Sequence, residues 1–385
     1  MRILLLGEYS NVHNTLAKGL RTLGHEVVVA SNGDFWKNYP RDIDLQRKTG
    51  KIGGISLWMK LMVNLNNFKN FDIVQLINPM FFELKAERLF WFYHFLRKHN
   101  KKVVMGAFGM DHYWVKTTRE HLFMRYSDFN IGNQLRTDKD AICHVEDWMG
   151  TTKERLNKLI ATDCDAIVAG LWESERAYSY EYKDKTCFIP YPIEISNEAK
   201  AADVGEKVKI LIGINRSRNK YKGTDILLEG AQKVVSTHPD KASLQVVENV
   251  PFAEYEQLVA KADILLDQAY SYTPAMNALM ALGKGVVVLG GGEEEPYALL
   301  DADTPRAVVN VEPNVQSVVE ALTPLVTNKK MLQQLKRDAI TYIKLNHDHI
   351  KVAQQYCNLY EKCSKTLFPC CLQQTKEASS LLRNL

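Results

Sequence analysis

The sequence lacks long apolar runs, paired cysteines and a secretory leader pattern. Its longest apolar stretches, such as Leu89–Leu96, are far shorter than the about 20 residues that a membrane-spanning helix needs. No Cys-x-x-Cys pair occurs, which argues against a structural zinc site. No basic start is followed by an apolar segment of about 7–15 residues, so we expect no secretory signal.

Strong charge of one sign is also missing. Lys and Arg number 49 against 45 Asp and Glu, a formal net charge of +4. This small excess does not argue for a nucleic-acid partner and is compatible with loose contact at an anionic membrane surface. The seven scattered cysteines are an odd number, which favours reduced thiols. We therefore expect a cytoplasmic protein, working in the cytoplasm or at the inner face of the membrane.

Apolar runs typical of buried strands alternate with helical patterns in the first half of the chain. Met1–Leu6 predicts a strand, Asn14–Leu23 a helix and His25–Ala30 a second strand. Strand, helix and strand within thirty residues form a βαβ unit, which builds a parallel sheet. The polar and aromatic region Asp111–Gly150 has weak periodicity and is interpreted as an insertion. Further strands are predicted at Ile73–Ile77, Lys102–Ala107 and Ala166–Ala169.

The same alternation restarts after a polar linker at Ile195–Glu206. The pattern therefore predicts the α/β class, with two Rossmann-like doubly wound domains at 1–195 and 207–345 and a segment at 346–385. Ligands of such sheets bind beyond the carboxyl ends of the strands, so the cleft between the domains is the expected site. The second series of strands is predicted at Val208–Ile212, Ser243–Val247, Ile264–Asp267 and Val286–Leu289.

The turn after the first strand does not have the Gly-x-Gly-x-x-Gly pattern of a dinucleotide fold. Of the three glycines only Gly7 is present, which argues against an enzyme that uses a nicotinamide cofactor. Gly7 either lets a ligand approach the backbone or simply ends the strand. His13 either faces the cleft or is an ordinary first-turn histidine.

Cations follow the first strand of the second domain. Arg suits bidentate contacts to phosphate and Lys suits neutralisation by a point charge. The loop therefore is either a phosphate site or a solvated basic loop, and its place at a strand end favours the first. The cations are Arg216, Arg218, Lys220 and Lys222.

A predicted helix start follows the strand that ends at Asp267. Ser271 and Tyr272 precede Thr273, a good N-cap residue, and Pro274 suits the first helical position. The free N–H groups of such a helix bind anions such as a diphosphate, although an ordinary capped helix has the same sequence. The glycine and glutamate run at 290–295 either contacts sugar hydroxyls or is a flexible acidic loop.

From about Met1 to Cys363, this layout resembles a GT-B-fold glycosyltransferase of retaining family 4, closest to the bacterial polysaccharide-assembly type. Lys222 matches the lysine of the family's Arg…Lys-Gly element, which grips the donor diphosphate, and Arg218 or Arg216 matches its arginine. Gly283 and Lys284 match the family's Gly-Lys. The resemblance also implies that a C-terminal helix within 346–385 packs back on the first domain, followed by a tail.

The sequence departs from the family at its Glu-x7-Glu signature. The first glutamate position falls near Tyr270, and the second, implied to hold the donor ribose, falls on Ala278. Asn277 is the candidate to replace it as a hydrogen-bonding residue. A first-domain histidine contacts the donor sugar in the family, and His112 is its candidate here.

The resemblance implies transfer of a sugar from a nucleotide-diphosphate donor to a glycan or lipid-linked acceptor hydroxyl, with retention. We expect no metal and no cofactor, because Arg218, Lys222 and the helix start would stabilise the leaving diphosphate. A sugar-nucleotide epimerase of the same fold is the alternative enzyme, and a catalytically inactive relic that binds glycan or nucleotide is the other alternative.

Overall fold

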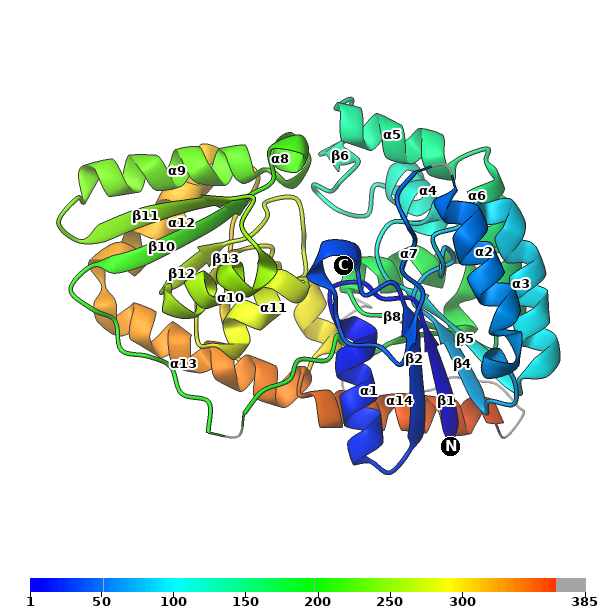
Figure 1. The fold of residues 1–385 in the computed structure, drawn as a ribbon. Coiled ribbons are helices and arrows are strands. Elements are labelled where there is room, and N and C mark those ends of the chain that lie inside the picture. The colour runs from blue at the N-terminus through cyan, green and yellow to red at the C-terminus, as the bar shows by residue number, and fades with distance from the viewer. Residues whose placement is uncertain (51, 197, 365–385) are drawn as a thin grey trace, which may run out of the picture.

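The computed structural model describes residues 1–50, 52–196 and 198–364. It contains two parallel β-sheets, each covered by helices on both faces, and both sheets are visible side by side in Figure 1. The tail expected after Pro369, with Cys370 and Cys371, lies outside the described residues. No helix in the described ranges is long and apolar enough to cross a membrane.

The first sheet has seven parallel strands in the order β3-β2-β1-β4-β5-β8-β9. Its chain order reverses between β1 and β4, which creates a crevice at their carboxyl ends. The strands are β1 Arg2–Leu6, β2 Glu26–Ser31, β3 Ile43–Asp44, β4 Ile73–Leu76, β5 Lys102–Ala107, β8 Ala166–Ala169 and β9 Thr186–Phe188. The helices around it are α1 Val12–Thr22, α2 Gly53–Val63, α3 Ala86–His99, α4 His112–His121, α5 Lys139–Trp148, α6 Thr152–Asp163 and α7 Trp172–Tyr182.

The second sheet has five parallel strands in the order β11-β10-β12-β13-β14. Here the chain order reverses between β10 and β12, so the loops after these strands border the second crevice. The strands are β10 Val208–Ile214, β11 Ala242–Glu248, β12 Ile264–Leu266, β13 Val287–Gly290 and β14 Val308–Asn310. The helices are α8 Asn219–Lys222, α9 Thr224–Thr237, α10 Phe252–Lys261, α11 Met276–Gly283, α12 Val315–Thr327 and α13 Lys329–Asn346.

Alternation along β1 explains why helices cover both faces of the first sheet. Ile3 and Leu5 belong to the core with α1, whereas Leu4 and Leu6 belong to the core with α3 and α6. All four side chains have no exposed surface, as expected of a central parallel strand. The continuous apolar run at the N-terminus therefore specifies a strand that is buried on both faces.

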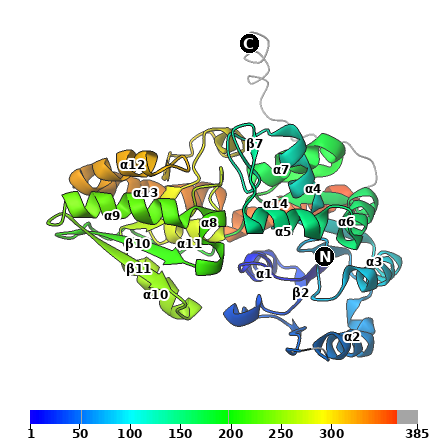
Figure 2. The same cartoon turned by 90° about the horizontal axis from the view of Figure 1, so that it is seen from above.

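The last described helix, α14 (His349–Ser364), leaves the second domain and packs on the first. A methyl group at Gly19 of α1 would lie 2.3 Å from the His349 carbonyl oxygen, so the two helices touch through their backbones. Tyr360 donates to Gln75 of β4 at 2.6 Å. Figure 2 shows α14 running from the second domain along the first.

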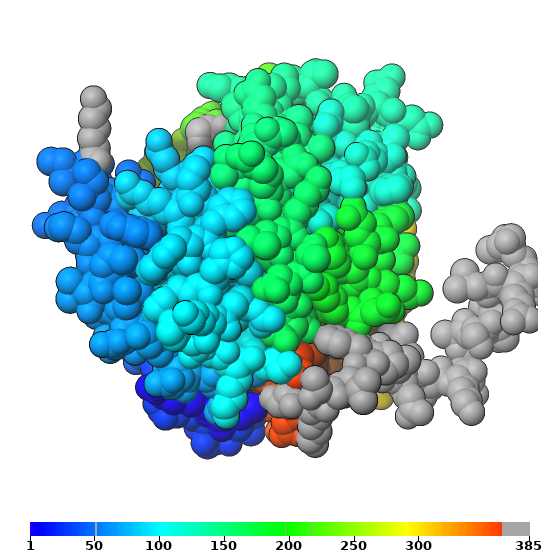
Figure 3. All heavy atoms as spheres, turned by 90° about the vertical axis from the view of Figure 1, so that its right-hand side faces the viewer, coloured from blue at the N-terminus to red at the C-terminus, as the bar shows by residue number. Residues whose placement is uncertain are grey.

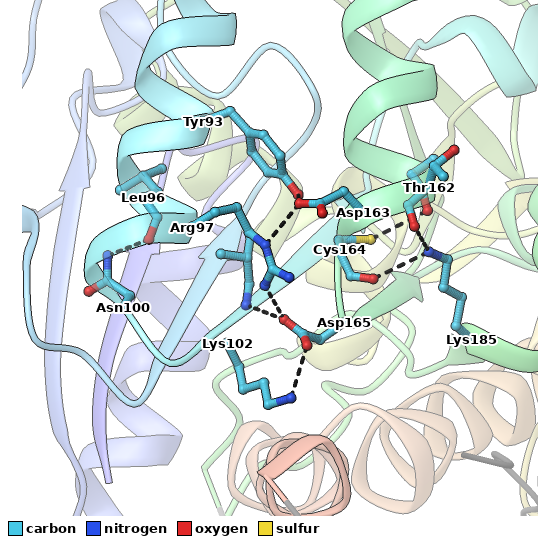
Figure 4. A network of polar contacts seen from close by, with 12 residues as sticks. Tyr93, Leu96, Arg97, Asn100, Lys102, Thr162, Asp163, Cys164, Asp165 and Lys185 are labelled. Atoms are coloured by element: carbon cyan, nitrogen blue, oxygen red, sulfur yellow. Dashed lines mark hydrogen bonds and ion pairs between the residues drawn. The ribbon is translucent and has the colours of Figure 1, made fainter. Parts of the chain in front are cut away.

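A polar network holds the amino-terminal edge of the first sheet, opposite the crevice (Figure 4). Asp165, just before β8, accepts hydrogen bonds from the Val103 backbone at 2.8 Å and from Arg97 of α3 at 2.5 Å. Arg97 also pairs with Asp163 at 2.8 Å. The network fastens α3 to the strand starts and leaves the carboxyl edge for other roles.

The predicted insertion forms α4, α5 and a small antiparallel hairpin, β6 (Asn130–Ile131) with β7 (Gln134–Leu135). In Figures 1 and 2 the hairpin and α5 lie beside α8 of the second domain. The ring centroids of His144 and Tyr221 are 5.4 Å apart. The insertion thus spans from the first domain to a loop that borders the second crevice.

Candidate functional site

The two loops at the second crevice pack directly on one another. The Ala269 N–H, after β12, donates to the Lys222 carbonyl at 3.0 Å. Gly223 has a φ of +71°, and a methyl group there would lie 2.9 Å from the Ala269 side chain. This close approach requires glycine at the position that follows the last cation of the basic loop.

Lys222 lies partly buried at the centre of this site. Burial lowers the pKa of its ammonium group, and the nearby carboxylate of Asp267 opposes that shift. Burial likewise raises the pKa of Asp267. The charge of Lys222 and a hydrogen bond from Asn277 Nδ2, at 2.7 Å, oppose this shift. The amide of Asn277 is therefore committed to Asp267, and Ala278 beside it has no exposed surface.

The two arginines of the basic loop take different directions from Lys222. Arg216 forms two hydrogen bonds with Glu248 at the end of β11, at 2.6 and 3.0 Å, and its side chain is 69% exposed. Arg218 is exposed and lies 5.1 Å from the ring centre of Tyr221. The structure thus brings Lys222 into the crevice and leaves Arg216 in a surface ion pair.

A carboxyl group from the first domain accepts hydrogen bonds from the backbone N–H groups after β12. Glu173, at the start of α7, is 4% exposed and accepts from the Tyr272 and Thr273 backbones, both at 2.8 Å. Burial raises its pKa, and these hydrogen bonds oppose the shift. The loop where a diphosphate was expected therefore donates to a carboxyl group, and that group is a side chain of the same protein.

The predicted helix start at this loop is wrong by two residues. Helix α11 begins at Met276, its N-cap is Ala275, and no side chain caps it. Thr273 is not the cap because its N–H is held by Glu173 and its carbonyl accepts from Ser271 at 2.6 Å. Pro274 lies two residues before the helix, so neither residue has the position that the sequence pattern indicated.

Several side chains of the insertion contact the second domain, and Arg136 is one of them. Arg136, only 6% exposed at its side chain, donates to the Lys220 and Tyr221 carbonyls at 2.9 and 3.3 Å. Its guanidinium also lies 3.9 Å from the ring centre of Tyr270. These contacts cover the end of the basic loop from the side of the first domain.

Arg125 and Tyr126 bind the acidic loop after the three glycines. Arg125 pairs with Glu293 at 2.6 Å and with Glu295 at 2.7 Å, and the Tyr126 hydroxyl donates to Glu293. The Arg125 N–H donates to the Tyr272 hydroxyl at 2.6 Å. The acidic loop thus joins the domains. A hollow of about 260 Å³ lies beside these groups, lined by residues 122–125, Gly132, Asn133 and Tyr272.

Gly7 and His13 have internal roles in the first domain. A methyl group at Gly7, where φ is +84°, would lie 2.3 Å from the Ile77 side chain. His13 is fully buried, with its Nδ1 2.9 Å from the Gly7 carbonyl, and does not face the cleft as one interpretation had it. Burial lowers the pKa of His13 to about 3, so the ring is neutral near pH 7.

His112 opens α4 and is 1% exposed. Its Nδ1 lies 3.1 Å from the Trp148 carbonyl oxygen, and its backbone N–H donates to the Asn157 side-chain oxygen at 3.0 Å. Both partners belong to the first domain. The structure therefore places His112 among α4, α5 and α6 and does not join it to Lys222.

Three site residues carried no local signal in the sequence. The sequence around Glu173 is that of an ordinary helix start. Arg136 lies in the weakly periodic insertion, and Asp267 lies at the end of a predicted strand. Each acquires its role from a partner far away in the chain. Within the described ranges, no group of three or more His, Cys, Asp and Glu residues is placed to hold a metal ion.

A scan against family models and a search of curated proteins find no match for this sequence. Solved structures do match it along almost all its length. The Anabaena protein HepE in complex with UDP-glucose is 12% identical, covers 95% of this chain and 100% of its own, and has a TM-score of 0.59. Sucrose-phosphate synthase from Thermosynechococcus elongatus is 13% identical, covers 95% of this chain and 100% of its own, and has a TM-score of 0.59.

The chain has the GT-B fold. This confirms the expected architecture of two Rossmann-like domains. A Listeria monocytogenes protein described as a UDP-N-acetylglucosamine 2-epimerase is also similar. It is 12% identical, covers 95% of this chain and 97% of its own, and has a TM-score of 0.53. At these identities the likeness establishes the fold alone, so any function must be argued from the residues at the crevice.

Proposed function

We propose that this protein is a glycosyltransferase that moves a sugar from a nucleotide-diphosphate sugar to an acceptor hydroxyl. The observation that carries the proposal is the carboxyl group held by the loop after β12. Two backbone N–H groups, from Tyr272 and Thr273, converge on one carboxylate oxygen at 2.8 Å each. Convergent N–H donors beside a strand end are a common way to bind phosphate.

Lys222 is the side chain that we propose stabilises the leaving diphosphate. It lies in the adjoining loop and is partly buried, where a charge interacts more strongly than in water. Preorganised donors of this kind are typically worth about 3–4 kcal/mol each in a dry site. Arg218, exposed above Tyr221, is the second cation that can turn toward a bound donor.

Glu173 and the donor phosphate compete for the same N–H groups in this proposal. A diphosphate carries more charge than the carboxylate, and it also interacts with Lys222. We therefore propose that donor binding displaces Glu173 and changes the contact between the domains. The neighbour crystallised with UDP-glucose supports a nucleotide-sugar donor without identifying the base or sugar here.

The finer parts of the proposal rest on the sequence resemblance. We propose retention of anomeric configuration, as in family 4, and a role in assembly of cell-surface polysaccharide or glycan. The ribose-binding glutamate of that family is replaced by the buried Ala278, and Asn277 is engaged by Asp267. The donor ribose must therefore find other partners, which is the main departure from the family pattern.

A thermal-shift panel of UDP-, GDP-, ADP- and CMP-sugars tests the donor. A ligand that binds only the folded protein raises its apparent stability, so the correct base raises the melting temperature. Failure of every nucleotide sugar to do so would contradict the proposed function. The anomer of the transfer product, read by NMR, then tests retention.

Lys222→Ala tests the diphosphate assignment. We expect transfer to fall at least about tenfold, equal to 1.4 kcal/mol or more of lost transition-state stabilisation, with folding intact. Lys220→Ala is the matched control, because Lys220 is an exposed lysine of the same loop. Full activity in folded Lys222→Ala protein would remove the assignment.

A sugar-nucleotide epimerase is the second candidate, favoured by the carboxyl groups at the crevice. Glu173 and Asp267 lie on opposite domains, and burial raises the pKa of both. Raised carboxyl pKa values suit acid and base catalysis at neutral pH. Identification of the sugar product separates the candidates, because an epimerase returns an intact nucleotide sugar. Donor binding without any turnover would instead identify a binding relic.

A further inference from the structure

Helix α2 is apolar around almost its whole circumference. Its sequence, GGISLWMKLMV, has Ser56 and Lys60 as the only polar side chains. Leu57 and Leu61 face inward and are 2% and 0% exposed. A helix that is apolar on every side is normally buried on every side, by protein or by lipid.

The outward side of α2 is not covered by the described protein. Ile52, just before the helix, is 75% exposed, and Ile55, Met59 and Val63 are 54%, 60% and 86% exposed. Their spacing of three, four and four residues places them in one line along the helix. Figure 3 shows this face of the molecule, with α2 in blue on its left side and α3 next to it.

Aromatic side chains border this line. The rings of Trp58 on α2 and Trp91 on α3 are 5.7 Å apart, and Trp91 is 46% exposed. Trp91 also stacks on Phe95, with ring centres 5.7 Å apart. Tryptophan at the edge of an apolar surface is typical of the boundary between lipid and water. We call Ile52, Ile55, Met59, Val63, Trp58 and Trp91 the α2 surface.

The chain around the α2 surface is basic. Residues 45–71 contain five Lys and Arg and no Asp or Glu. The Arg47 guanidinium lies against Gly53 and Gly54 at the helix start. Arg88 lies 5.6 Å from the Trp58 ring centre and Lys69 lies 5.7 Å from that of Phe95.

Acidic neighbours offset only part of this charge, and the carboxylate of Glu83 interacts with Arg47. Asp44, before the segment, pairs with Lys60 at 3.2 Å. Glu87 of α3 hydrogen-bonds with Thr152 on α6, away from α2. An exposed apolar line, a tryptophan border and basic flanks on one helix are the combination that binds interfaces of anionic lipid.

We propose that the α2 surface docks the first domain on an anionic lipid bilayer, with the helix lying in the plane of the interface. The four apolar side chains would enter the boundary between headgroups and acyl chains, and the basic residues would contact the phosphates. Charge complementarity favours lipid over a second copy of this chain, because two copies meeting at α2 would bring their basic flanks together. The proposal needs no nucleotide and stands apart from the transfer reaction.

Flotation with vesicles tests the surface directly. We expect the full chain to float with vesicles of equal parts phosphatidylglycerol and phosphatidylcholine, and far less with phosphatidylcholine alone. Raising the salt concentration should release it, because each basic residue contributes about fivefold to partitioning onto an anionic surface. Absence of flotation with anionic vesicles at low salt would overturn the proposal.

Met59→Glu is the decisive variant, and Met331→Glu is its matched control. Met59 is 60% exposed on α2, and Met331 is 42% exposed on α13 of the other domain, so neither change disturbs a core. We expect Met59→Glu to lower vesicle partitioning by about tenfold or more and Met331→Glu to leave it unchanged. Equal partitioning of the two variants would contradict the α2 assignment.

Lys48→Glu separates a lipid surface from a protein interface. Lys48 is exposed beside the helix start, and reversing its charge should weaken binding to anionic vesicles without affecting the oligomeric state. Sedimentation velocity without vesicles supplies the second measurement. If Met59→Glu dissolves a dimer and leaves vesicle binding intact, the surface joins two copies and the lipid proposal is wrong. Donor binding should be the same in all these variants.

Discussion

At the scale of single residues, the crevice is defined by side chains that already satisfy one another. Asn277 donates to Asp267, Arg216 pairs with Glu248, and Glu173 takes the N–H groups after β12. Lys222 has its pKa lowered by burial although Asp267 is near. A donor must therefore exchange some of these contacts for its own.

Glu173→Gln is expected to tighten nucleotide-diphosphate binding by about tenfold, equal to about 1.4 kcal/mol. The amide oxygen can still accept the two N–H groups, but the negative charge that competes with phosphate is gone. Calorimetry with the nucleotide that responds in the thermal panel measures this. Glu175→Gln on the same helix is the control, since Glu175 accepts from Ser179 instead.

The same variant reports on catalysis. If Glu173 were the acid or base of an epimerase, Glu173→Gln would abolish turnover without tightening the nucleotide. Weaker nucleotide binding in this variant would contradict competition between Glu173 and phosphate.

At the scale of elements, the strand patterns of the sequence predicted the sheets well. β5 and β8 have the predicted bounds, and β1, β4, β10 and β11 differ from theirs by one or two residues. Apolar runs are reliable here because a central parallel strand buries both faces. The start of α11 was predicted wrongly: Thr and Pro favour a helix start locally, but the Thr273 N–H donates to Glu173 and the helix begins only at Met276.

One element depends on a buried ion pair. Lys336 of α13 donates to Asp263, before β12, at 2.6 Å, and the two side chains are 2% and 7% exposed. We expect Lys336→Met to destabilise the second domain by about 3–5 kcal/mol, because it leaves a buried carboxylate without its counter-charge. Chemical denaturation measures the loss.

Two further variants test this explanation. Lys330→Met, at an exposed position of the same helix, should change stability by no more than about 0.5 kcal/mol. Lys336→Met combined with Asp263→Asn should recover part of the loss. A single variant as stable as the parent would show that the pair contributes nothing.

At the scale of the whole molecule, the insertion controls how the domains meet. Arg136 donates to two carbonyls of the basic loop and lies over Tyr270. We expect Arg136→Ala to weaken the junction by about 1–3 kcal/mol and to increase the radius of gyration in small-angle scattering. The surface variant Arg155→Ala should scatter like the parent. An unchanged radius for Arg136→Ala would mean that the other junction contacts suffice.

The chain crossing from α13 to α14 adds a pH dependence. His347 is 3% exposed, its Nδ1 is 2.8 Å from the Tyr191 carbonyl, and burial lowers its pKa to about 4. The unfolded histidine binds a proton below about pH 6.5 and the folded one does not. The contribution of His347 to the free energy of unfolding is therefore complete above about pH 6.5. It is lost as the pH falls toward 4, and the loss reaches about 3 kcal/mol.

His347→Gln should flatten the pH dependence of stability between about pH 6.5 and 4. Denaturation at a series of pH values measures this. Parallel curves for the variant and the parent would contradict the assignment. His13, whose pKa is about 3, contributes in the same direction and remains in both proteins.

The sequence by itself determined the two parallel sheets, the loops that border the second crevice and Lys222 as a cation at a strand end. These follow from short-range patterns, since burial of a strand and the place of a loop depend on neighbouring residues. The tertiary structure alone decided which groups meet at the crevice: Glu173 on the N–H groups of Tyr272 and Thr273, Arg136 on the basic loop and His112 away from it. Such contacts join residues on separate elements or domains, and the energy of a hydrogen bond or ion pair depends on distance in space, which no local pattern encodes.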